Sequence, residues 1–359
     1  MAETVLVTGG TGYVGGWAIV ALLQRGYDVR TTVRSLAKAD AVRTAVGSVA
    51  QPQPPTDDED AAAADASGDR LTFAVADLMM DDGWDAAMVG VDYVLHVASP
   101  LGDETSKDPD ALIIPARDGA LRVLEAATRA AVKRVVMTSA ANAASPASYA
   151  EDGITDETLW TVDDPKLPAY RRSKTLAEKA VWDFMASYDG PTELTTVLPG
   201  AVLGPILSAD NVGTTRIIQR MLSGKMPGAP KIGLEVVDVR DLVDLHIRAM
   251  LSPEAAGERF LGTGEFVWMR EIAAALKAGL GDQAKSVPTR ELPNFVVRLA
   301  SLTDPSLRAL TISLGRRNRH STAKAERILG WKPRSAAQTV VECAESLIAH
   351  GAARDRMAG

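Results

Sequence analysis

The sequence predicts an α/β fold, a doubly wound parallel sheet that carries a smaller carboxy-terminal lobe. Three observations support this prediction. Short apolar runs alternate with helix-like segments through the first half of the chain, a glycine-rich turn follows the first run, and the alternation becomes irregular from about residue 199. Strands that are separated by helices pair in parallel. At 359 residues the chain is long enough for one large α/β unit with an appended lobe.

The first domain is expected to span residues 1–198, and most of residues 199–359 are expected to form the lobe, with some segments returning to the sheet. The predicted strands cover residues 5–8, 28–33, 71–75, 93–97, 134–137 and 194–198. A helix follows the glycine-rich turn to about Arg25, where Gly26 ends it, and another helix-like run follows Ser35. The lobe should lie over the carboxyl edge of the sheet, where doubly wound folds bind ligands.

One segment interrupts this alternation. Residues 47–69 contain a proline- and glutamine-rich stretch, then the acidic run 57–60, then a run of alanines. Such a composition cannot bury enough apolar surface to order the chain. We therefore expect a mobile, solvated insertion that takes no part in chemistry.

The composition excludes several classes of function. With 46% hydrophobic and 24% charged residues and no run of 18 apolar residues, the chain is typical of soluble proteins and no membrane span is expected. The single cysteine, Cys343, and four scattered histidines offer neither a disulfide nor a metal site. The net charge of −7 disfavours nucleic acid. Because Met1 is followed almost at once by an apolar strand, without a leader pattern, a cytoplasmic protein that binds a small molecule is expected.

The turn after the first strand is the first candidate site. Gly9, Gly12 and Gly15 are spaced three residues apart, directly after an apolar strand and at the start of an amphipathic helix. A dinucleotide pyrophosphate is negatively charged and must approach the backbone closely, so it suits a turn without side chains at the positive end of a helix dipole. This setting predicts a Rossmann-type dinucleotide site. The cofactor-binding residues expected in this turn are Gly9, Thr11, Gly12, Tyr13, Val14 and Gly15.

The end of the second strand favours NADP over NAD. Arg34 stands there with Lys38 nearby, whereas Asp28 lies at the other end of the strand, where it is badly placed to reach the ribose. An arginine at this position pairs with the 2′-phosphate of NADP, and a carboxylate would accept the 2′-hydroxyl of NAD. A solvated arginine at a strand end is the alternative, and NAD is not excluded. Asp77 and Leu78 could receive the adenine.

The segment Val97-Ala98-Ser99, after the fourth strand, could border the pyrophosphate and ribose. Like Asp77-Leu78, it could equally be ordinary turn chemistry.

Tyr170 and Lys174 form the second candidate site. They are four residues apart at the start of a predicted helix, so their side chains lie on one helical face. Reducing a carbonyl group requires a proton donor for the developing alkoxide. A phenol has a pKa of about 10, so bringing it near 7 takes roughly 4 kcal/mol, which an adjacent ammonium and a cationic nicotinamide ring could supply together.

With these two motifs in place the chain resembles the extended short-chain dehydrogenase/reductase superfamily. Within it, the chain is similar to the branch of dihydroflavonol reductases, cinnamoyl-CoA reductases and microbial aldehyde and ketone reductases. The resemblance covers nearly the whole chain. Its motifs, in order, are Thr8-Gly9-Gly10-Thr11-Gly12-Tyr13-Val14-Gly15, Thr32-Val33-Arg34, Asp77-Leu78, His96-Val97-Ala98-Ser99-Pro100, Val135-Val136-Met137-Thr138-Ser139, Tyr170 with Ser173-Lys174-Thr175-Leu176-Ala177-Glu178, Pro199 with Gly204-Pro205, Val237-Asp238-Val239-Arg240-Asp241 and Ile328-Leu329-Gly330-Trp331-Lys332-Pro333.

The resemblance implies roles for these residues. Tyr170 would be the acid/base, Lys174 would bind the nicotinamide ribose and lower the pKa of the tyrosine, and a serine after the fifth strand would hydrogen-bond the substrate oxygen. The Thr-Val-Arg ending implies NADP. The cofactor site would also include Tyr170, Lys174, Pro199, Gly200 and Val202.

The chain departs from the branch at the catalytic serine. Reductases of this branch usually carry Thr-Ser-Ser, and an ungapped alignment places Ala140 at the second serine. Ser139 is the candidate for the role after a small shift of the loop; Asn142 or a water molecule are alternatives. Losing one such donor typically slows an enzyme by about 10²- to 10³-fold without abolishing its activity.

The predicted function is NADPH-dependent reduction of an aldehyde or ketone, reversible as an alcohol dehydrogenase. A nucleotide-sugar epimerase or dehydratase is the second interpretation, although residues 200–230 look more apolar than a diphosphate-binding lobe, unless they are core residues. A non-enzymatic NADP-binding sensor would explain Ala140, but the presence of both Tyr170 and Lys174 argues against it. His246 is expected to be structural. The sequence leaves open a monomer or a homodimer.

Overall fold

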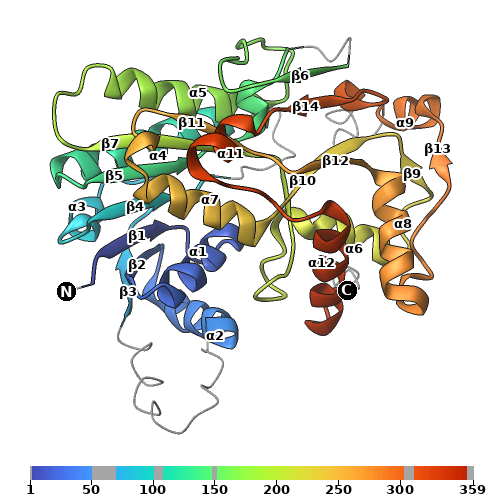
Figure 1. Cartoon of the computed structure of the whole chain (residues 1–359), viewed down its shortest axis with the longest axis horizontal. Coiled ribbons are helices and arrows are strands. Elements are labelled where there is room, and N and C mark those ends of the chain that lie inside the picture. Colours follow the sequence, from blue (N-terminus) through green and yellow to red (C-terminus); the bar gives the residue numbers. More distant parts are fainter. Residues whose placement is uncertain (1, 51–69, 101–107, 148–151, 303–310, 354–359) are drawn as a thin grey trace, which may run out of the picture.

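The computed structural model describes residues 2–50, 70–100, 108–147, 152–302 and 311–353. Its centre is a seven-stranded parallel sheet with the strand order β3-β2-β1-β4-β5-β7-β11 (Figure 1). The chain order reverses between β1 and β4, the point at which doubly wound sheets bind ligands. The strands are β1 (Thr4–Thr8), β2 (Asp28–Val33), β3 (Leu71–Val75), β4 (Tyr93–His96), β5 (Arg134–Thr138), β7 (Glu193–Pro199) and β11 (Arg259–Gly262).

Helices cover both faces of this sheet, because successive strand residues alternate between two apolar clusters. Leu6 and Val94 face the side of α3 (Trp84–Met88), α4 (Asp110–Arg129) and α5 (Ala169–Met185). Val7 and Leu95 face the side of α1 (Tyr13–Gln24), α2 (Ala39–Ala50) and α7 (Val239–Leu251). A sheet buried on both faces explains why its strands are short apolar runs. The predicted α/β fold is confirmed.

Smaller sheets and helices form the lobe, which lies to the right in Figure 1. Its three-stranded sheet consists of β8 (Ala201–Leu203), β10 (Gly233–Asp238) and β12 (Glu265–Trp268). Two strand pairs accompany it: β9 (Ala229–Pro230) with β13 (Glu291–Leu292), and β6 (Gly153–Thr155) with β14 (Asn318–His320). Within the described residues, the lobe also contains α6 (Arg216–Leu222), α8 (Met269–Leu280), α9 (Asn294–Ala300) and α12 (Ala336–Ala349), whereas α11 (Ala323–Leu329) packs on β11 and α7 of the large sheet. The 3-10 helices in the described part of the chain are η1 (Leu36–Lys38), η2 (Ala141–Ala144), η3 (Gly213–Thr215), η4 (Pro253–Ala255), η5 (Gly281–Ala284) and η6 (Thr311–Ser313).

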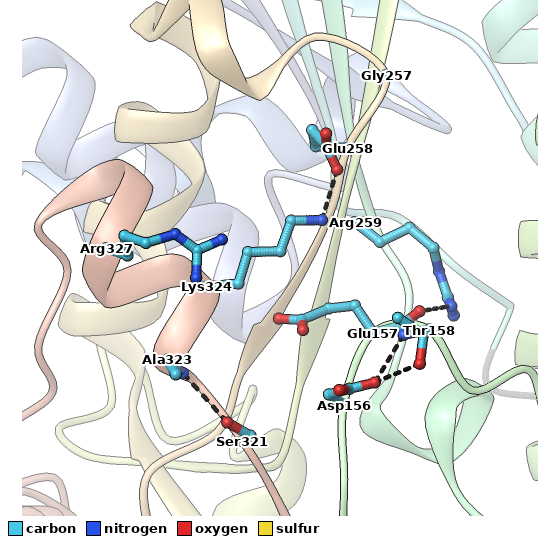
Figure 2. A pocket seen from close by; sticks show the side chains of 10 residues that line it. All are labelled: Asp156, Glu157, Thr158, Gly257, Glu258, Arg259, Ser321, Ala323, Lys324 and Arg327. Carbon is cyan, nitrogen blue, oxygen red and sulfur yellow. Dashed lines mark hydrogen bonds and ion pairs between the residues drawn. The ribbon is translucent and has the colours of Figure 1, made fainter.

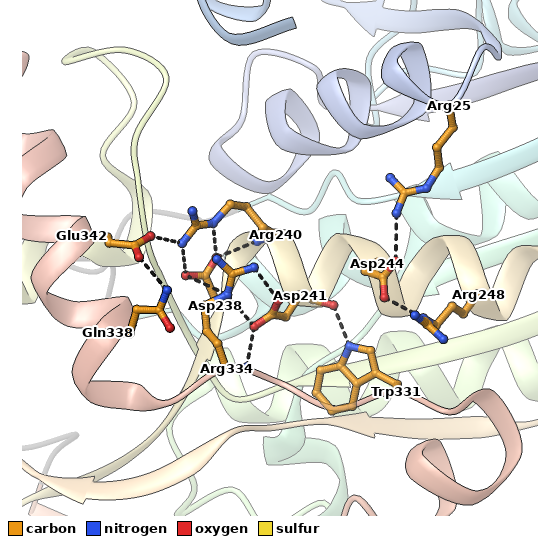
Figure 3. Close-up of polar contacts among 10 residues, drawn as sticks. All are labelled: Arg25, Asp238, Arg240, Asp241, Asp244, Arg248, Trp331, Arg334, Gln338 and Glu342. Carbon is orange, nitrogen blue, oxygen red and sulfur yellow. Dashed lines mark hydrogen bonds and ion pairs between the residues drawn. The ribbon is translucent and has the colours of Figure 1, made fainter. Parts of the chain in front are cut away.

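A network of charged side chains fastens the carboxy-terminal segment to α7 (Figure 3). Asp238 is fully buried, caps α7 through the Arg240 amide and receives two hydrogen bonds from the Arg240 guanidinium. The Arg240 guanidinium also pairs with Glu342 of α12. Arg334 binds the Asp241 carboxylate at 2.7 and 2.9 Å. The motifs at residues 237–241 and 328–333 are far apart in sequence but in contact in the fold, because the Trp331 indole donates to the Asp241 carbonyl at 2.7 Å.

Residues 47–50, assigned to the insertion, instead form the last turn of α2 because alanine, serine and valine continue the helix that began at Ala39; the rest of the predicted insertion, residues 51–69, lies outside the described residues. The division at residue 198 stays a prediction, although β11 and α7 lie in and on the large sheet. None of the described helices is both long and apolar enough to cross a membrane.

Candidate active site

The turn between β1 and α1 leaves no room for a side chain at Gly9 or Gly15. Gly9 has a φ of +75°, and a Cβ atom added there would lie 3.0 Å from the Cβ atom of Ala98. A Cβ atom at Gly15 would lie only 2.2 Å from the Gly9 carbonyl oxygen, which also accepts the Gly12 amide at 2.8 Å. Among the residues that the structure describes, no side chain caps α1 at Gly12, so the amides of the first turn are available to an anion. This cradle fits the pyrophosphate of a dinucleotide.

A hydrogen-bond cluster holds the end of β4 beside this turn. The Thr8 hydroxyl oxygen accepts the amides of Val97 and Ala98 at 3.1 and 3.0 Å and lies 2.9 Å from Nδ1 of His96. Because the hydroxyl already accepts two bonds, it donates its proton to Nδ1. Burial and the nearby Lys174 lower the pKa of His96 to about 3, so the imidazole stays neutral. Val97 and Ala98 are thus fixed against the glycine-rich turn.

Two exposed cations stand at the carboxyl end of β2. Arg34 follows the strand directly, and Lys38 ends the short helix η1. Within the described part of the chain, neither side chain forms an ion pair or hydrogen bond. Arg30, by contrast, donates to the carbonyls of Ala87 and Val89, and Asp28 begins the strand at its opposite end. This arrangement matches a site for the 2′-phosphate of NADP.

The turn after β3 is held by its own contacts. Asp77 accepts the Met79 amide at 3.0 Å, and its carbonyl accepts the indole N–H of Trp84 at 3.1 Å. Leu78 packs against Gly119 of α4, where an added Cβ atom would lie 2.9 Å from the Leu78 Cβ atom. These contacts are those of an ordinary turn, the alternative that the sequence left open for Asp77 and Leu78. Binding of the adenine by these two residues stays a prediction.

The residues expected on the lobe side lie at the same sheet edge. Pro199 ends β7, Gly200 approaches Glu235 so closely that a Cβ atom would lie 2.4 Å from its carbonyl oxygen, and Val202 pairs with Val237 in the lobe sheet. Residues of the following segment reach α1: the Trp17 indole donates to the Pro205 carbonyl at 2.8 Å.

Tyr13 turns its side chain into the core. Its hydroxyl is buried without a hydrogen-bond partner among the described residues, and burial raises its pKa well above the ordinary value of 10. A Cβ atom added at Gly213 would lie 3.1 Å from the Tyr13 Cβ atom, so the lobe covers this side chain. What Tyr13 presents to the turn is therefore its backbone, as the first residue of α1.

Tyr170 and Lys174 occupy the first turns of α5 but have different surroundings. Tyr170 is 42% exposed, yet the protein around its hydroxyl raises the pKa of the phenol, and Lys174 does not offset this effect. Lys174 is 7% exposed, and burial lowers its pKa to about 8 while Glu178 acts in the opposite direction. Within the described residues the ammonium forms no hydrogen bond or ion pair. The chain alone therefore does not bring Tyr170 to a pKa near 7.

The segment after β5 places the candidate oxygen donors differently. Ser139 is buried, and its hydroxyl donates to the Glu178 carboxylate at 2.7 Å. Ala140 presents only a methyl group. Asn142 is half-buried, and its backbone carbonyl accepts the Thr161 hydroxyl at 2.6 Å, while its side-chain amide has no hydrogen bond within the described residues. The role of Ser139 toward the substrate stays a prediction.

Sequence reasoning missed two buried polar groups near this segment. Glu178 had a signal, since it follows Lys174 at the same helical spacing by which Lys174 follows Tyr170. The other is His320, whose Nδ1 binds Glu235 and whose Nε2 lies 2.8 Å from the Ser145 hydroxyl. His320 had no signal, because 175 positions separate it from Ser145.

His246 is buried and bridges α7 and β5. Its Nδ1 donates to the Leu242 carbonyl and its Nε2 accepts from Thr138, each at 2.8 Å. Burial lowers the pKa of His246 to about 4. Both ring nitrogens are thus used by the fold, which agrees with the structural role expected from the sequence.

A polar cavity of about 390 Å³ lies away from these residues, between the start of β11, residues 156–158 and α11 (Figure 2). Lys324 reaches across it to Glu258, and Arg259 donates to the Glu157 carbonyl. Its lining is Asp156, Glu157, Thr158, Gly257, Glu258, Arg259, Ser321, Ala323, Lys324 and Arg327. Neither Tyr170 nor the glycine-rich turn lines this cavity, so it is separate from the candidate active site.

Comparisons with known proteins agree with this geometry. A cinnamoyl-CoA reductase of Medicago truncatula is 32% identical over 268 residues, which cover 73% of this chain and 76% of that protein. A dihydroflavonol 4-reductase of Zea mays is 32% identical over 283 residues, or 76% of this chain and 73% of that protein. The crystal structure of yeast methylglyoxal/isovaleraldehyde reductase Gre2 complexed with NADPH has the same fold, with a TM-score of 0.77 at 23% identity over 98% of this chain and 100% of that chain.

The family follows from a match over most of the chain. The model of the NAD dependent epimerase/dehydratase family covers residues 5–261, from β1 to β11. The resemblance to extended short-chain dehydrogenase/reductases, drawn from the motifs alone, is confirmed. The chain belongs to the NAD dependent epimerase/dehydratase family.

Proposed function

We propose that this protein reduces an aldehyde or ketone to an alcohol with NADPH. The observation that carries the proposal is the pair of Tyr170 and Lys174 on one face of α5, beside a sheet edge where the glycine-rich turn and Arg34 suit a phosphorylated dinucleotide. The cinnamoyl-CoA and dihydroflavonol reductases that the chain is similar to over about three quarters of its length support the same chemistry.

Different residues would bind the cofactor and transfer the proton. When bound, NADPH would supply the hydride and, after its transfer, a positively charged ring. Tyr170 gives its phenolic proton to the oxygen of the substrate, and the ammonium of Lys174 stabilises the phenolate that remains. Burial raises the pKa of Tyr170, so the phenol is protonated at neutral pH and ready to donate. The amides of the α1 first turn hold the pyrophosphate, and Arg34 with Lys38 hold the 2′-phosphate.

The epimerase or dehydratase interpretation rests on the same scaffold. Residues 200–230 are apolar, which speaks against it, but most of their large apolar side chains lie in the core, while Leu207, Ile217 and Met226 are partly buried against it. Leu203, Ile206, Ile218, Met221 and Leu222 are at most 8% exposed. These five residues therefore do not form the surface that a substrate would contact. Reductase chemistry is preferred because the chain is similar to a cinnamoyl-CoA reductase and a dihydroflavonol reductase.

A substrate panel tests the proposal. NADPH oxidation is followed with aromatic aldehydes, diketones and 3-ketosteroids, and interconversion of UDP-sugars is assayed in parallel. We expect turnover with at least one carbonyl compound. Turnover of a UDP-sugar alone would establish the second interpretation, and tight NADPH binding without any turnover would establish the sensor.

Arg34→Ala should change the cofactor preference. The variant loses a charge-assisted contact to the 2′-phosphate, so we expect the KM for NADPH to rise about ten- to hundredfold while the KM for NADH changes little. Arg117→Ala on α4 removes the same charge from another exposed site and serves as the control. An equal loss with both cofactors would show that Arg34 does not contact the 2′-phosphate.

A further inference from the structure

Glu178 is a fully buried carboxylate one helical turn beyond Lys174. Oε1 accepts the Thr196 hydroxyl of β7 at 2.7 Å and Nε of Arg259 of β11 at 2.8 Å. Oε2 accepts the Ser139 hydroxyl at 2.7 Å and Nη2 of Arg259 at 3.3 Å. Both carboxylate oxygens of Glu178 therefore accept hydrogen bonds, from the hydroxyl groups of Thr196 and Ser139 and, charge-assisted, from the guanidinium of Arg259.

The three residues that hydrogen-bond Glu178 are themselves buried and held by other contacts. Arg259 is 8% exposed, donates to the Leu159 carbonyl at 3.2 Å, and lies 3.6 Å from the centre of the Trp160 ring. Thr196 and Ser139 are buried as well. The carboxylate therefore cannot rotate away from its place without breaking several hydrogen bonds, and its charge has a fixed position relative to the next turn of α5.

Within the described residues, Glu178 is the charged group that favours the ammonium form of Lys174. His96 of β4 faces it but is neutral, because burial and Lys174 itself lower the pKa of that imidazole to about 3. Tyr170, on the preceding turn of α5, is a neutral phenol whose pKa is raised by burial. Burial also lowers the pKa of Lys174 to about 8, and Glu178 is the charged group that opposes this effect.

We propose that Glu178 is a positioning residue that keeps Lys174 in its ammonium form, and that Ser139, Thr196 and Arg259 hold Glu178 rather than touch the substrate. The proposal rests on the proposed function, in which Lys174 must be charged to stabilise the Tyr170 phenolate. It assigns the Ser139 hydroxyl to this buried network, because its proton is already donated to Glu178.

The direct test measures the titration of Lys174 without turnover. The protein is labelled with ¹³C at the lysine ε carbons, the Lys174 signal is assigned with Lys174→Arg, and wild type is compared with Glu178→Gln. A nearby carboxylate favours the ammonium, so its loss should lower the pKa of Lys174 by about one unit. An unchanged pKa in a folded Glu178→Gln variant overturns the proposal, whether or not a carbonyl substrate has been found.

The pH profile of kcat gives a second readout. Activity requires the ammonium, so it is present below the pKa of Lys174 and lost as the pH rises through it. In Glu178→Gln this alkaline limb should move to lower pH, in the same direction as the NMR titration. A loss of kcat that is equal at every pH would indicate a merely structural role and contradict the proposal.

Matched variants separate charge from packing. Glu178→Gln leaves a buried guanidinium without its partner, so the double variant Glu178→Gln with Arg259→Gln is the form to use if the single variant does not fold. Glu342→Gln, which removes a carboxylate paired with Arg240 in the lobe, should leave the Lys174 titration unchanged.

Ser139→Ala tests the last part of the proposal. It keeps the Glu178 carboxylate but removes one of its donors, so kcat should fall by no more than about tenfold, whereas loss of a substrate donor would reduce kcat by about 10²- to 10³-fold. A loss of that larger size would assign Ser139 to the substrate and overturn its role as a holder.

Discussion

Tyr170→Phe should reduce kcat for carbonyl reduction by about 10²- to 10⁴-fold and leave NADPH binding nearly unchanged. The substitution removes only the hydroxyl group that donates the proton, and the ring keeps its place in the first turn of α5. Because burial raises the pKa of Tyr170, the wild-type phenol holds this proton at neutral pH, and it lies on the same helical face as Lys174. Initial rates of NADPH oxidation at saturating substrate, with NADPH affinity measured by fluorescence, check both parts.

Tyr188→Phe is the control for Tyr170→Phe. Tyr188 follows the end of α5, where its ring stacks on Phe184 with centroids 6.2 Å apart, and it should tolerate loss of its hydroxyl without a change in kcat. A Tyr170→Phe variant that retains more than about a tenth of the wild-type kcat would show that another group supplies the proton.

The nucleotide half of the site could be predicted because its determinants are local. The glycine-rich turn is formed by residues of one loop. The predicted 2′-phosphate site at the end of the second strand is formed by Arg34 and its sequence neighbours. In the structure Gly9 takes a positive φ and Gly15 packs on the Gly9 carbonyl, while the cofactor-binding roles of these residues stay predictions. Strand positions were predictable for the same reason, since a sheet buried on both faces leaves a short apolar run for each strand.

Contacts between segments that are far apart in the sequence could not be predicted. Arg259 lies 81 residues from the Glu178 that it binds, and no local pattern links the two. The Tyr13 side chain could not be oriented because the lobe segment around Gly213 covers it. The apolar residues between 200 and 230 could be assigned to core or to substrate surface only once their burial was known.

Ala140→Ser should raise kcat, by about 10²- to 10³-fold if no other group now fills the role of the missing donor. Ala140 follows β5 in an extended conformation, with φ −157° and ψ 149°, and caps η2, a position at which serine is well tolerated. The new hydroxyl would stand at the position where reductases of this branch carry their serine. Its donor would be independent of Ser139, whose proton is used by Glu178.

Three further variants test why Ala140→Ser would raise kcat. Ala141→Ser adds a hydroxyl one position away and should leave kcat unchanged. Ser139→Ala in the Ala140→Ser background should keep the gain, because the two hydroxyl groups serve different partners. If Ala140→Ser gives no increase while Asn142→Ala lowers kcat by about 10²-fold or more, the Asn142 amide already donates to the carbonyl oxygen. In that case the chain has moved the donor from position 140 to position 142, and the alanine at position 140 leaves room for it.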